Sequence, residues 1–374
     1  MISDKLLVPH DPDRDGPWDV PRAAHLLRRA GFGAGRQEVD EAVAKGLEAA
    51  VEDLFDDAED QEAEFQDTFQ RISGSLVDFA DIGRLRAWWC YRMMRSRTPL
   101  REKLTLFWHG HFATSIAKVE DAYLMHQQLE TLRHHAWGNF RDLVLAIAKD
   151  PAMLVYLDGE SNTKEHPNEN FAREVMELFT LGIGNYTERD VLEGARALTG
   201  WQRGPKATVE FHPDLHDAER KEFLGRHGRF KTEDVVDILM LQPATPRFIA
   251  RKLLVFFVCP EPSDAVVAEA VHLLAETRLN VEWFLRDLFR SKYFYSPDCR
   301  RCRISSPAEF VLGTCQALGV RMAADELAQQ MAAMGQELFA PPNVKGWEGE
   351  KKWIHSTSWA ARVAFAQQVA QVVS

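Results

Sequence analysis

Hydrophobic residues recur every three or four positions along most of the chain. This spacing places them on one face of an α-helix, so the pattern predicts a mainly helical protein. Proline and glycine mark helix boundaries: the first helix is expected to begin near Pro21 and to end at Gly31. Further helices are expected at residues 36–57, 82–96, 99–112, 119–137, 139–149, 168–181, 187–199, 232–241, 245–258, 263–276, 280–290, 307–318, 323–335 and 358–372. Residues 58–70 are acidic and weakly patterned, which is compatible with a helix or a loop.

Strand signals are few. The best is residues 207–211 (ATVEF), and a partner is expected near Arg229 and Phe230, because the intervening residues are polar and rich in turn formers. No fixed-period repeat and no break in composition divides the chain. The sequence therefore predicts an all-α fold, with residues 1–374 forming a single domain of about fifteen helices and one short β-hairpin or long loop near residues 203–230. Residues 1–20 are expected to be a flexible N-terminal segment.

The charge balance bears on possible partners. The chain has 45 Lys and Arg against 56 Asp and Glu, a formal net charge of −11. Nucleic-acid binding needs clustered positive charge, so no nucleic-acid partner is expected. Residues 84–103 do combine basic and aromatic side chains, but their Trp and Met positions also suit packing in a helical core.

Hydropathy and cysteine content indicate a cellular compartment. No run of about 18 apolar residues occurs, so no membrane partner is expected. The first 20 residues lack the features of a secretory signal. Five sparse cysteines are typical of reduced thiols, so we expect a cytoplasmic protein. Cys299 and Cys302 form a lone CxxC, whereas a zinc site would need a second pair.

Long, ordered segments carry a family resemblance. They are HLLRRAGFG at 25–33, LREKLTLFWHGHFATS at 100–115, LRHHAWGNFRDLVLAIAKDPAMLVYLD at 132–158, NENFAREVMELFTLGIGNYTERDVLEGARALTGW at 168–201, PATPRFIARKLLVFFV at 243–258, SPAEFVLG at 306–313 and PPNVKGW at 341–347. Together they resemble the bacterial family catalogued as domain of unknown function 1800, over roughly residues 21–370. The resemblance implies a helical fold and leaves the activity unassigned.

Polar residues gather on one face of the expected helix 168–181. At 100° per residue, Asn170, Arg173, Glu174 and Glu177 share one arc and the hydrophobic residues lie opposite. The stripe could be a solvated face with Arg173 and Glu177 paired. It could instead line a pocket, where two carboxylates beside a guanidinium divide acid and base roles or bind a metal.

Two histidines form a second candidate, in FWHGHF. Residues at i and i+2 do not share a helix face, so His109 and His111 converge only if the chain turns at Gly110. His111 would lie on the apolar side of the helix. It is therefore either a buried structural histidine or half of a catalytic or metal-binding pair.

Other candidates are scattered. His126 falls at the edge of an apolar arc, and Asn343 and Trp347 lie on the stiff loop PPNVKGW. Trp347 and Trp201 could each plug the core or form a platform for a sugar or ring substrate. Zincin, GxSxG, Walker A and GxGxxG motifs are absent from the sequence.

Two hypotheses follow. The first is a cytoplasmic hydrolase or lyase with Glu174, Glu177, His111 and Arg173 as catalytic residues. Its small-molecule or sugar-like substrate would contact His109, His126, Asn170, Trp201, Asn343 and Trp347. A divalent metal is compatible with the carboxylates, and the sequence does not define the cofactor further. The second is a non-catalytic binding or assembly protein whose polar cluster fixes helix register. An open pocket would favour the first and a closed core the second; the sequence does not define the oligomeric state.

Overall fold

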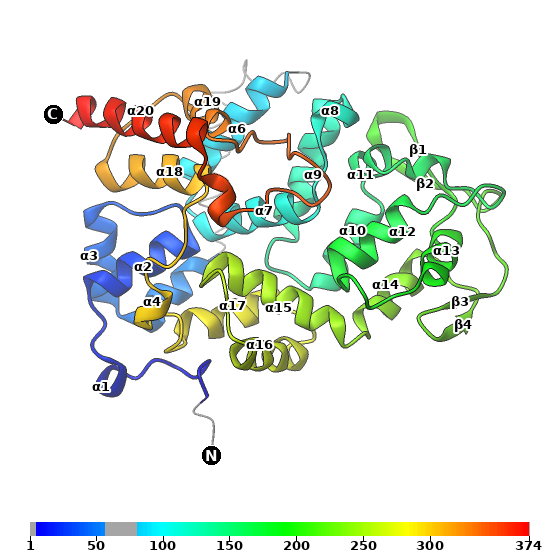
Figure 1. Ribbon diagram of the computed structural model, residues 1–374, viewed down its shortest axis with the longest axis horizontal. Helices are drawn as coiled ribbons and strands as arrows, with labels where there is room; N and C mark the ends of the chain where they lie inside the picture. The colour runs from blue at the N-terminus through cyan, green and yellow to red at the C-terminus, as the bar shows by residue number, and fades with distance from the viewer. Residues whose placement is uncertain (1–4, 57–80, 374) are drawn as a thin grey trace.

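The computed structural model describes residues 5–56 and 81–373, and within these ranges the protein folds into nineteen α-helices and two small two-stranded ribbons (Figure 1). The expected all-α fold is confirmed. The stretch 58–70 lies outside the described residues. No described helix is both long and apolar enough to span a bilayer.

Most helices of the first half lie in the expected ranges. The helices of this half are α1 (Pro12–Asp15), α2 (Val20–Ala30), α3 (Arg36–Lys45), α4 (Leu47–Glu52), α6 (Ile82–Arg95), α7 (Pro99–His111), α8 (Ile116–Val119), α9 (Ala122–His134), α10 (Phe140–Ala148) and α11 (Pro151–Tyr156). The three short helices α1, α8 and α11 were not expected. The stretch expected as one helix over 36–57 is divided at Gly46, whose φ of 86° ends one helix and begins the next. Asp19 and Asp150 cap α2 and α11 by accepting backbone N–H groups of the first turn.

The second half contains α12 (Asn170–Glu174), α13 (Glu188–Ala197), α14 (Thr232–Met240), α15 (Ala244–Phe257), α16 (Asp264–Glu276), α17 (Val281–Arg290), α18 (Pro307–Leu318), α19 (Ala324–Ala333) and α20 (Ser356–Val373). Capping boxes begin α13 and α18: Thr187 pairs with Asp190, and Ser306 pairs with Glu309.

The region near 203–230 holds two ribbons. Strand β2 (Val209–Phe211) pairs antiparallel with β1 (Trp201–Arg203), while β3 (Lys221–Phe223) pairs with β4 (Arg226–Gly228). The expected partner of 207–211 near Arg229 and Phe230 was therefore wrong. The chain turns back directly after α13, and the rings of Trp201 and Phe211 pack 5.2 Å apart across the first ribbon.

The expected helix 168–181 also differs from a regular α-helix. After α12 the chain continues as a π-helix over Val175–Thr180, in which the N–H of Leu181 donates to the carbonyl of Met176 at 2.8 Å. The Thr180 hydroxyl donates to the Val175 carbonyl at 2.5 Å. A π-helix has a wider turn than an α-helix, so the periodicity assumed for the polar stripe does not extend past Glu174.

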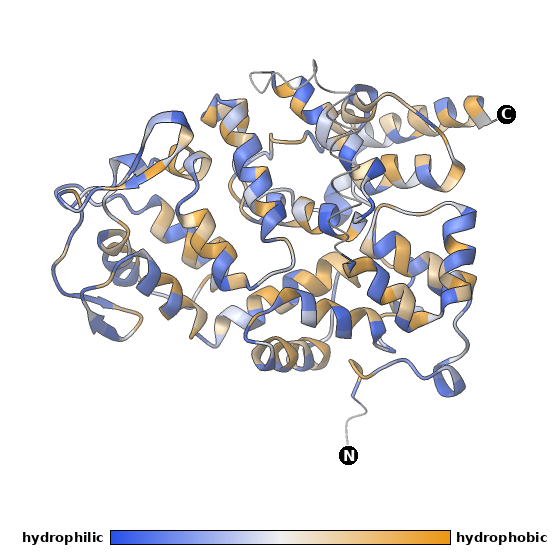
Figure 2. Cartoon of the chain, turned by 180° about the vertical axis from the view of Figure 1, so that it is seen from behind, coloured by the Kyte–Doolittle hydropathy of each residue, from blue (hydrophilic) through white to orange (hydrophobic). Residues whose placement is uncertain are grey.

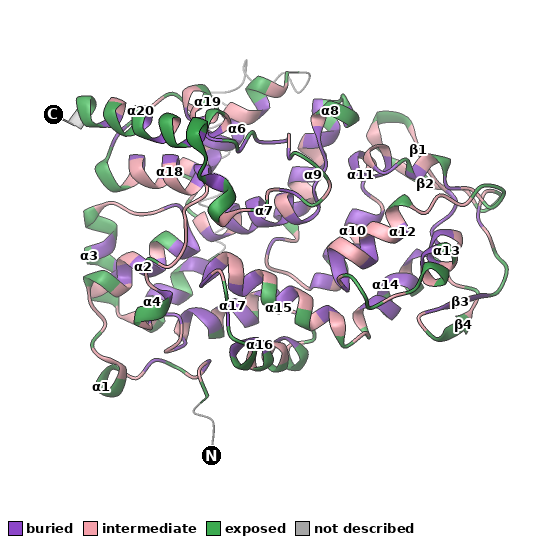
Figure 3. Ribbon diagram, in the orientation of Figure 1, coloured by how far each residue is buried: buried purple, intermediate pink, exposed green. Residues whose placement is uncertain are grey.

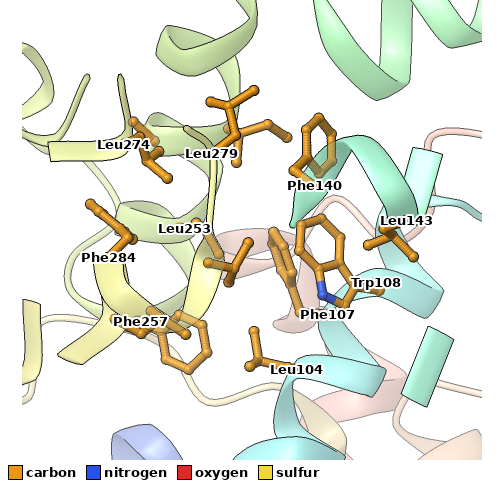
Figure 4. Close-up of a cluster of buried hydrophobic side chains, with 14 of the residues drawn as sticks. Leu104, Phe107, Trp108, Phe140, Leu143, Leu253, Phe257, Leu274, Leu279 and Phe284 are labelled. Atoms are coloured by element: carbon orange, nitrogen blue, oxygen red, sulfur yellow. The ribbon is translucent and has the colours of Figure 1, made fainter. Parts of the chain in front are cut away.

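Helix α7 lies at the centre of the molecule, and ten of its thirteen residues are buried. Figure 4 shows Leu104, Phe107 and Trp108 of this helix meeting Leu253 and Phe257 of α15. A second hydrophobic cluster joins α6, α9, α18, α19 and α20. Figure 2 shows that the helices carry both hydrophobic and hydrophilic residues, and Figure 3 shows α7 mostly buried while α20 is largely exposed.

The described part of the N-terminal segment is bonded to the body of the protein. The backbone N–H groups of Leu6 and Leu7 donate to the Glu269 carboxylate, and that of His10 donates to the Arg290 carbonyl at 2.8 Å. These hydrogen bonds hold the start of the described chain against α16 and α17.

Candidate functional site

A cavity of about 430 Å³ opens beside the C-terminal end of α7. Its other walls come from α15, from the start of α18 and from residues 345–353. Aromatic side chains form much of the lining: Phe107, Phe248, Phe256, Trp347 and Trp353. Both the size and the mainly apolar lining are typical of small-molecule sites.

His111 and Lys252 meet in this cavity. The Lys252 Nζ lies 3.0 Å from the His111 Nδ1, and the His111 Nε2 lies 3.0 Å from the carbonyl oxygen of Phe179. Because a carbonyl only accepts, Nε2 carries the proton and Nδ1 accepts from Lys252. Phe179 belongs to the π-helix, and its carbonyl holds the His111 imidazole in the tautomer that is protonated at Nε2.

Burial shifts the titration of both groups. It lowers the pKa of His111 well below its usual 6.5, and the neighbouring Lys252 lowers it further, so the imidazole is neutral. Burial also lowers the pKa of Lys252 to about 8. A neutral base and an amine that titrates near physiological pH therefore lie in hydrogen-bond contact.

Glu309 is a buried carboxylate at the edge of the cavity. It lies 2.7 Å from the Lys103 Nζ, 3.5 Å from Arg29 and 3.8 Å from Arg303. Burial alone would raise the pKa of Glu309, but Lys103, Arg303 and Arg29 hold it well below the usual range. Arg303 also donates to Glu350 at 2.7 Å. These charges satisfy one another, which leaves none of them a clear ligand for substrate.

Residues 341–353, which begin with PPNVKGW, form one wall of the cavity and are called the covering loop. Gly346 adopts a φ of 75° and rests against the end of α7 at Gly110. Trp347 lines the cavity, and its ring lies 5.6 Å from that of His109. Asn343 is exposed and its side-chain oxygen accepts the N–H of Lys345, so it shapes the turn.

The polar stripe of 170–177 is divided among different neighbours. Arg173 pairs with Glu188 at 2.7 Å and with Glu169 at 3.0 Å, near the surface. Glu177 accepts from the Tyr186 hydroxyl at 2.7 Å.

The other two members of the stripe, Asn170 and Glu174, differ in their surroundings. Asn170 is exposed and lies 3.3 Å from Asp158. Glu174 is half-buried, and burial followed by the nearby Glu177 raises its pKa, while Lys345 of the covering loop opposes the shift. Of the stripe, only Glu174 is electrostatically linked to a residue that lines the cavity.

The remaining candidates lie elsewhere. His109 is buried on another side of α7, where its Nε2 accepts the N–H of Phe339 at 3.2 Å, and burial lowers its pKa to about 3. His126 packs edge-on against Trp88 at 5.2 Å. The Trp201 indole donates to the Thr232 hydroxyl at 2.8 Å. His111 and Trp347 thus line the same cavity, whereas His109, His126 and Trp201 do not line it, although His109 packs against the Trp347 ring from outside.

Sequence reasoning missed Lys252. A signal was present: its neighbours at i−4 and i+4 on α15 are Phe248 and Phe256, so the lysine lies within an aromatic row. A lysine in such a row either leaves the core or is buried in a pocket. No group of three or more His, Cys, Asp or Glu residues in the described ranges is arranged to hold a metal ion.

Fold and cavity together define an all-α protein with an aromatic, small-molecule-sized pocket built around α7 and α15. The chain belongs to the family described as Protein of unknown function (DUF1800), whose model matches residues 25–373. No curated protein and no solved structure is similar to it.

Proposed function

We propose that the protein is an enzyme, of the lyase type, that acts on a small molecule held in the cavity between α7, α15 and the covering loop. The observation that carries the proposal is the 3.0 Å contact between the Lys252 amine and the His111 Nδ1 inside that cavity. An amine, an adjacent base and a third group that orients the base form a familiar catalytic arrangement. Here the third group is the Phe179 carbonyl.

The two side chains divide the work. Lys252 supplies an amine that can lose and regain a proton near neutral pH. His111 accepts a proton at Nδ1 and returns it, because Nε2 stays bonded to Phe179. A hydrolase is the less favoured reaction type, since the lining hydroxyl of Ser306 already accepts the N–H of Glu309 as a helix cap.

The non-catalytic alternative fits the other predicted residues better. Arg173 and Glu177 are engaged in pairs away from the cavity, and His109 accepts a backbone N–H within the core. We therefore propose structural roles for these three residues. Glu174 stays a candidate because of its interaction with Lys345.

We also propose a cytoplasmic location, since all five cysteines are free thiols. A small molecule is the proposed partner. The net charge of −11 remains the argument against a nucleic-acid partner.

The test compares three variants in a small-molecule screen read by ligand-observed NMR and by turnover. Lys252→Met and His111→Gln should each abolish turnover of any substrate found with the native protein. Lys118→Met is the matched control, because Lys118 is an exposed lysine paired with Asp158. Turnover that survives in both cavity variants would refute the proposal.

A further inference from the structure

Lys252, which is half-buried, differs from the two buried lysines Lys103 and Lys221 in what surrounds its amine. Lys103 lies 2.7 Å from the Glu309 carboxylate, and Lys221 lies 3.5 Å from that of Asp217. Within residues 5–56 and 81–373, no carboxylate lies within 4.0 Å of the Lys252 Nζ. A lysine that serves only structure is normally paired when it is buried.

The contacts of the Lys252 amine are all uncharged. They are the His111 Nδ1 at 3.0 Å, the Leu178 carbonyl at 3.4 Å and the Phe248 ring, whose centroid is 4.9 Å from Nζ. A neutral amine has two hydrogens and one lone pair. The two acceptors take the two hydrogens, which leaves the lone pair for a molecule in the cavity.

We propose that Lys252 forms an imine with the carbonyl carbon of a small aldehyde or ketone bound in the cavity. This inference rests on the proposed function and adds the covalent step and the substrate class. In the first step the Lys252 lone pair attacks the carbonyl carbon, and the carbonyl oxygen takes up a proton from the solvent. The nitrogen gives a proton to the His111 Nδ1, which yields a carbinolamine.

In the second step the carbon–oxygen bond breaks. His111 returns its proton to the departing hydroxyl, and water leaves as the carbon–nitrogen double bond forms. The sum is amine, carbonyl and one proton giving a protonated imine and water, with no oxidant or reductant. The protonated imine draws electrons from the neighbouring carbon, which is how a lysine assists cleavage of an adjacent bond.

The walls indicate an aromatic or branched apolar carbonyl compound. Phe248 and Phe256 flank Lys252 along α15, and Trp347 and Trp353 face the same cavity. Of the arginine and other lysine side chains that line the cavity, Arg303 is paired with Glu350, and Arg251 and Lys345 are the others. The aromatic walls form most of the apolar surface of the cavity, which favours an uncharged ligand.

The experiment traps the imine. Native protein is incubated with benzaldehyde and sodium cyanoborohydride, whose hydride converts the imine to a stable benzyl-amine, and peptides are mapped by mass spectrometry. Lys252 should be labelled at least about tenfold faster than the exposed Lys118. Glyceraldehyde 3-phosphate should label Lys252 more slowly than benzaldehyde does.

Variants and a non-covalent probe separate the outcomes. His111→Gln should slow labelling of Lys252 while leaving labelling of Lys118 unchanged; circular dichroism and melting confirm that the variant is folded. Benzyl alcohol has the aryl group without the carbonyl, and its binding is followed by saturation-transfer NMR. If it binds but Lys252 is labelled no faster than Lys118, the imine is refuted while the proposed pocket stands. Equal labelling of the two lysines without binding of benzyl alcohol refutes the imine and also counts against an aromatic ligand.

Discussion

Gly346 stands so close to Gly110 that a Cβ added to Gly346 would lie 2.0 Å from the Gly110 carbonyl oxygen. The contact joins the covering loop to the end of α7, one residue from His111. Since the φ of Gly346 is 75°, a side chain there meets both backbone strain and a direct clash.

Gly346→Ala should therefore lower the free energy of unfolding by about 2–4 kcal/mol and reduce ligand binding in the cavity. Gly335→Ala is the control: its φ is 97° but its added Cβ would meet no atom within 4 Å. Strain alone should lower its stability by about 1 kcal/mol. Urea unfolding measures both variants, and equal losses would show that the contact with Gly110 is not tight.

The buried carboxylate of Glu102 should be essential to stability. It accepts from Arg92 at 3.0 Å and from Arg133 at 2.8 Å, and its side chain has no solvent exposure. Glu102→Gln removes a fully buried charge that faces two guanidinium groups, one of which also lies 4.0 Å from Glu130, so we expect a loss of about 3–5 kcal/mol.

The matched control is Glu188→Gln. Glu188 pairs with Arg173 but its side chain is 78% exposed, so the loss should stay below about 0.5 kcal/mol. Chemical denaturation compares the two. A small loss for Glu102→Gln would mean that the arginines relax to other partners.

Lys252→Met should change how stability depends on pH. The Lys252 pKa falls from 10.5 to about 8 on folding, so the unfolded chain binds more protons between pH 8 and 10.5. In the native protein this group destabilises the fold below pH 8, and the penalty disappears as the pH rises to 10.5. The variant should be more stable than the native protein by about 1–2 kcal/mol at pH 7, since the lysine is half-buried, and equal to it near pH 10.5.

Denaturant melts across this pH range provide the measurement. Lys103, whose pKa burial also lowers to about 8, contributes the same trend in both proteins and cancels in the difference. A difference that stays constant with pH would contradict the assignment of the titration to Lys252.

The contribution of Asp150 to the pH dependence of stability should have the opposite sign. Burial raises its pKa from 3.8 to about 7, so the folded chain binds more protons between these values and stability falls as the pH rises through them. Asp150→Asn keeps an oxygen that can accept from Gln128 and from the backbone of Met153. It should raise stability by on the order of 2 kcal/mol at pH 8 and by little at pH 4.

Asp121→Asn is the control for this prediction. Asp121 caps α9 as Asp150 caps α11, but it is exposed. Its replacement should change stability by less than about 0.5 kcal/mol, since Asp and Asn cap helices almost equally well. Thermal melts at pH 4 and 8 measure the stability of both variants. If Asp150→Asn is no more stable than the native protein at pH 8, folding does not bury an ionised Asp150 carboxylate.

The sequence allowed the helices to be predicted because their signals are local. Pro99 begins α7 and a change of backbone conformation after His111 ends it, close to the expected limits of 99–112. The pairing of β2 was not predictable in the same way, because two ribbons of three-residue strands leave several partners equally plausible. The π-helix at Val175–Thr180 depends on bonds such as Thr180 to Val175, which no periodicity reveals.

The candidate site was only partly predictable for a related reason. His111 stood out as a histidine on the apolar side of its helix, and Trp347 as an indole on a stiff loop. Their meeting with Lys252 depends on three segments that are distant in sequence, and one sequence contains no record of such contacts. The polar stripe was visible from the periodicity, but the partners of its members, such as Tyr186 and Glu188, were not.

The covering loop is synthesised after the rest of the cavity, and this order affects how the cavity forms. Residues 341–353 follow every other wall of the cavity in the sequence, so on the ribosome α7 and α15 emerge first. Until the loop docks through Gly346, the cavity lacks the walls formed by Trp347 and Trp353. If Lys252 forms the proposed imine, selection for an aromatic ligand therefore begins only after the C-terminal part of the chain has folded.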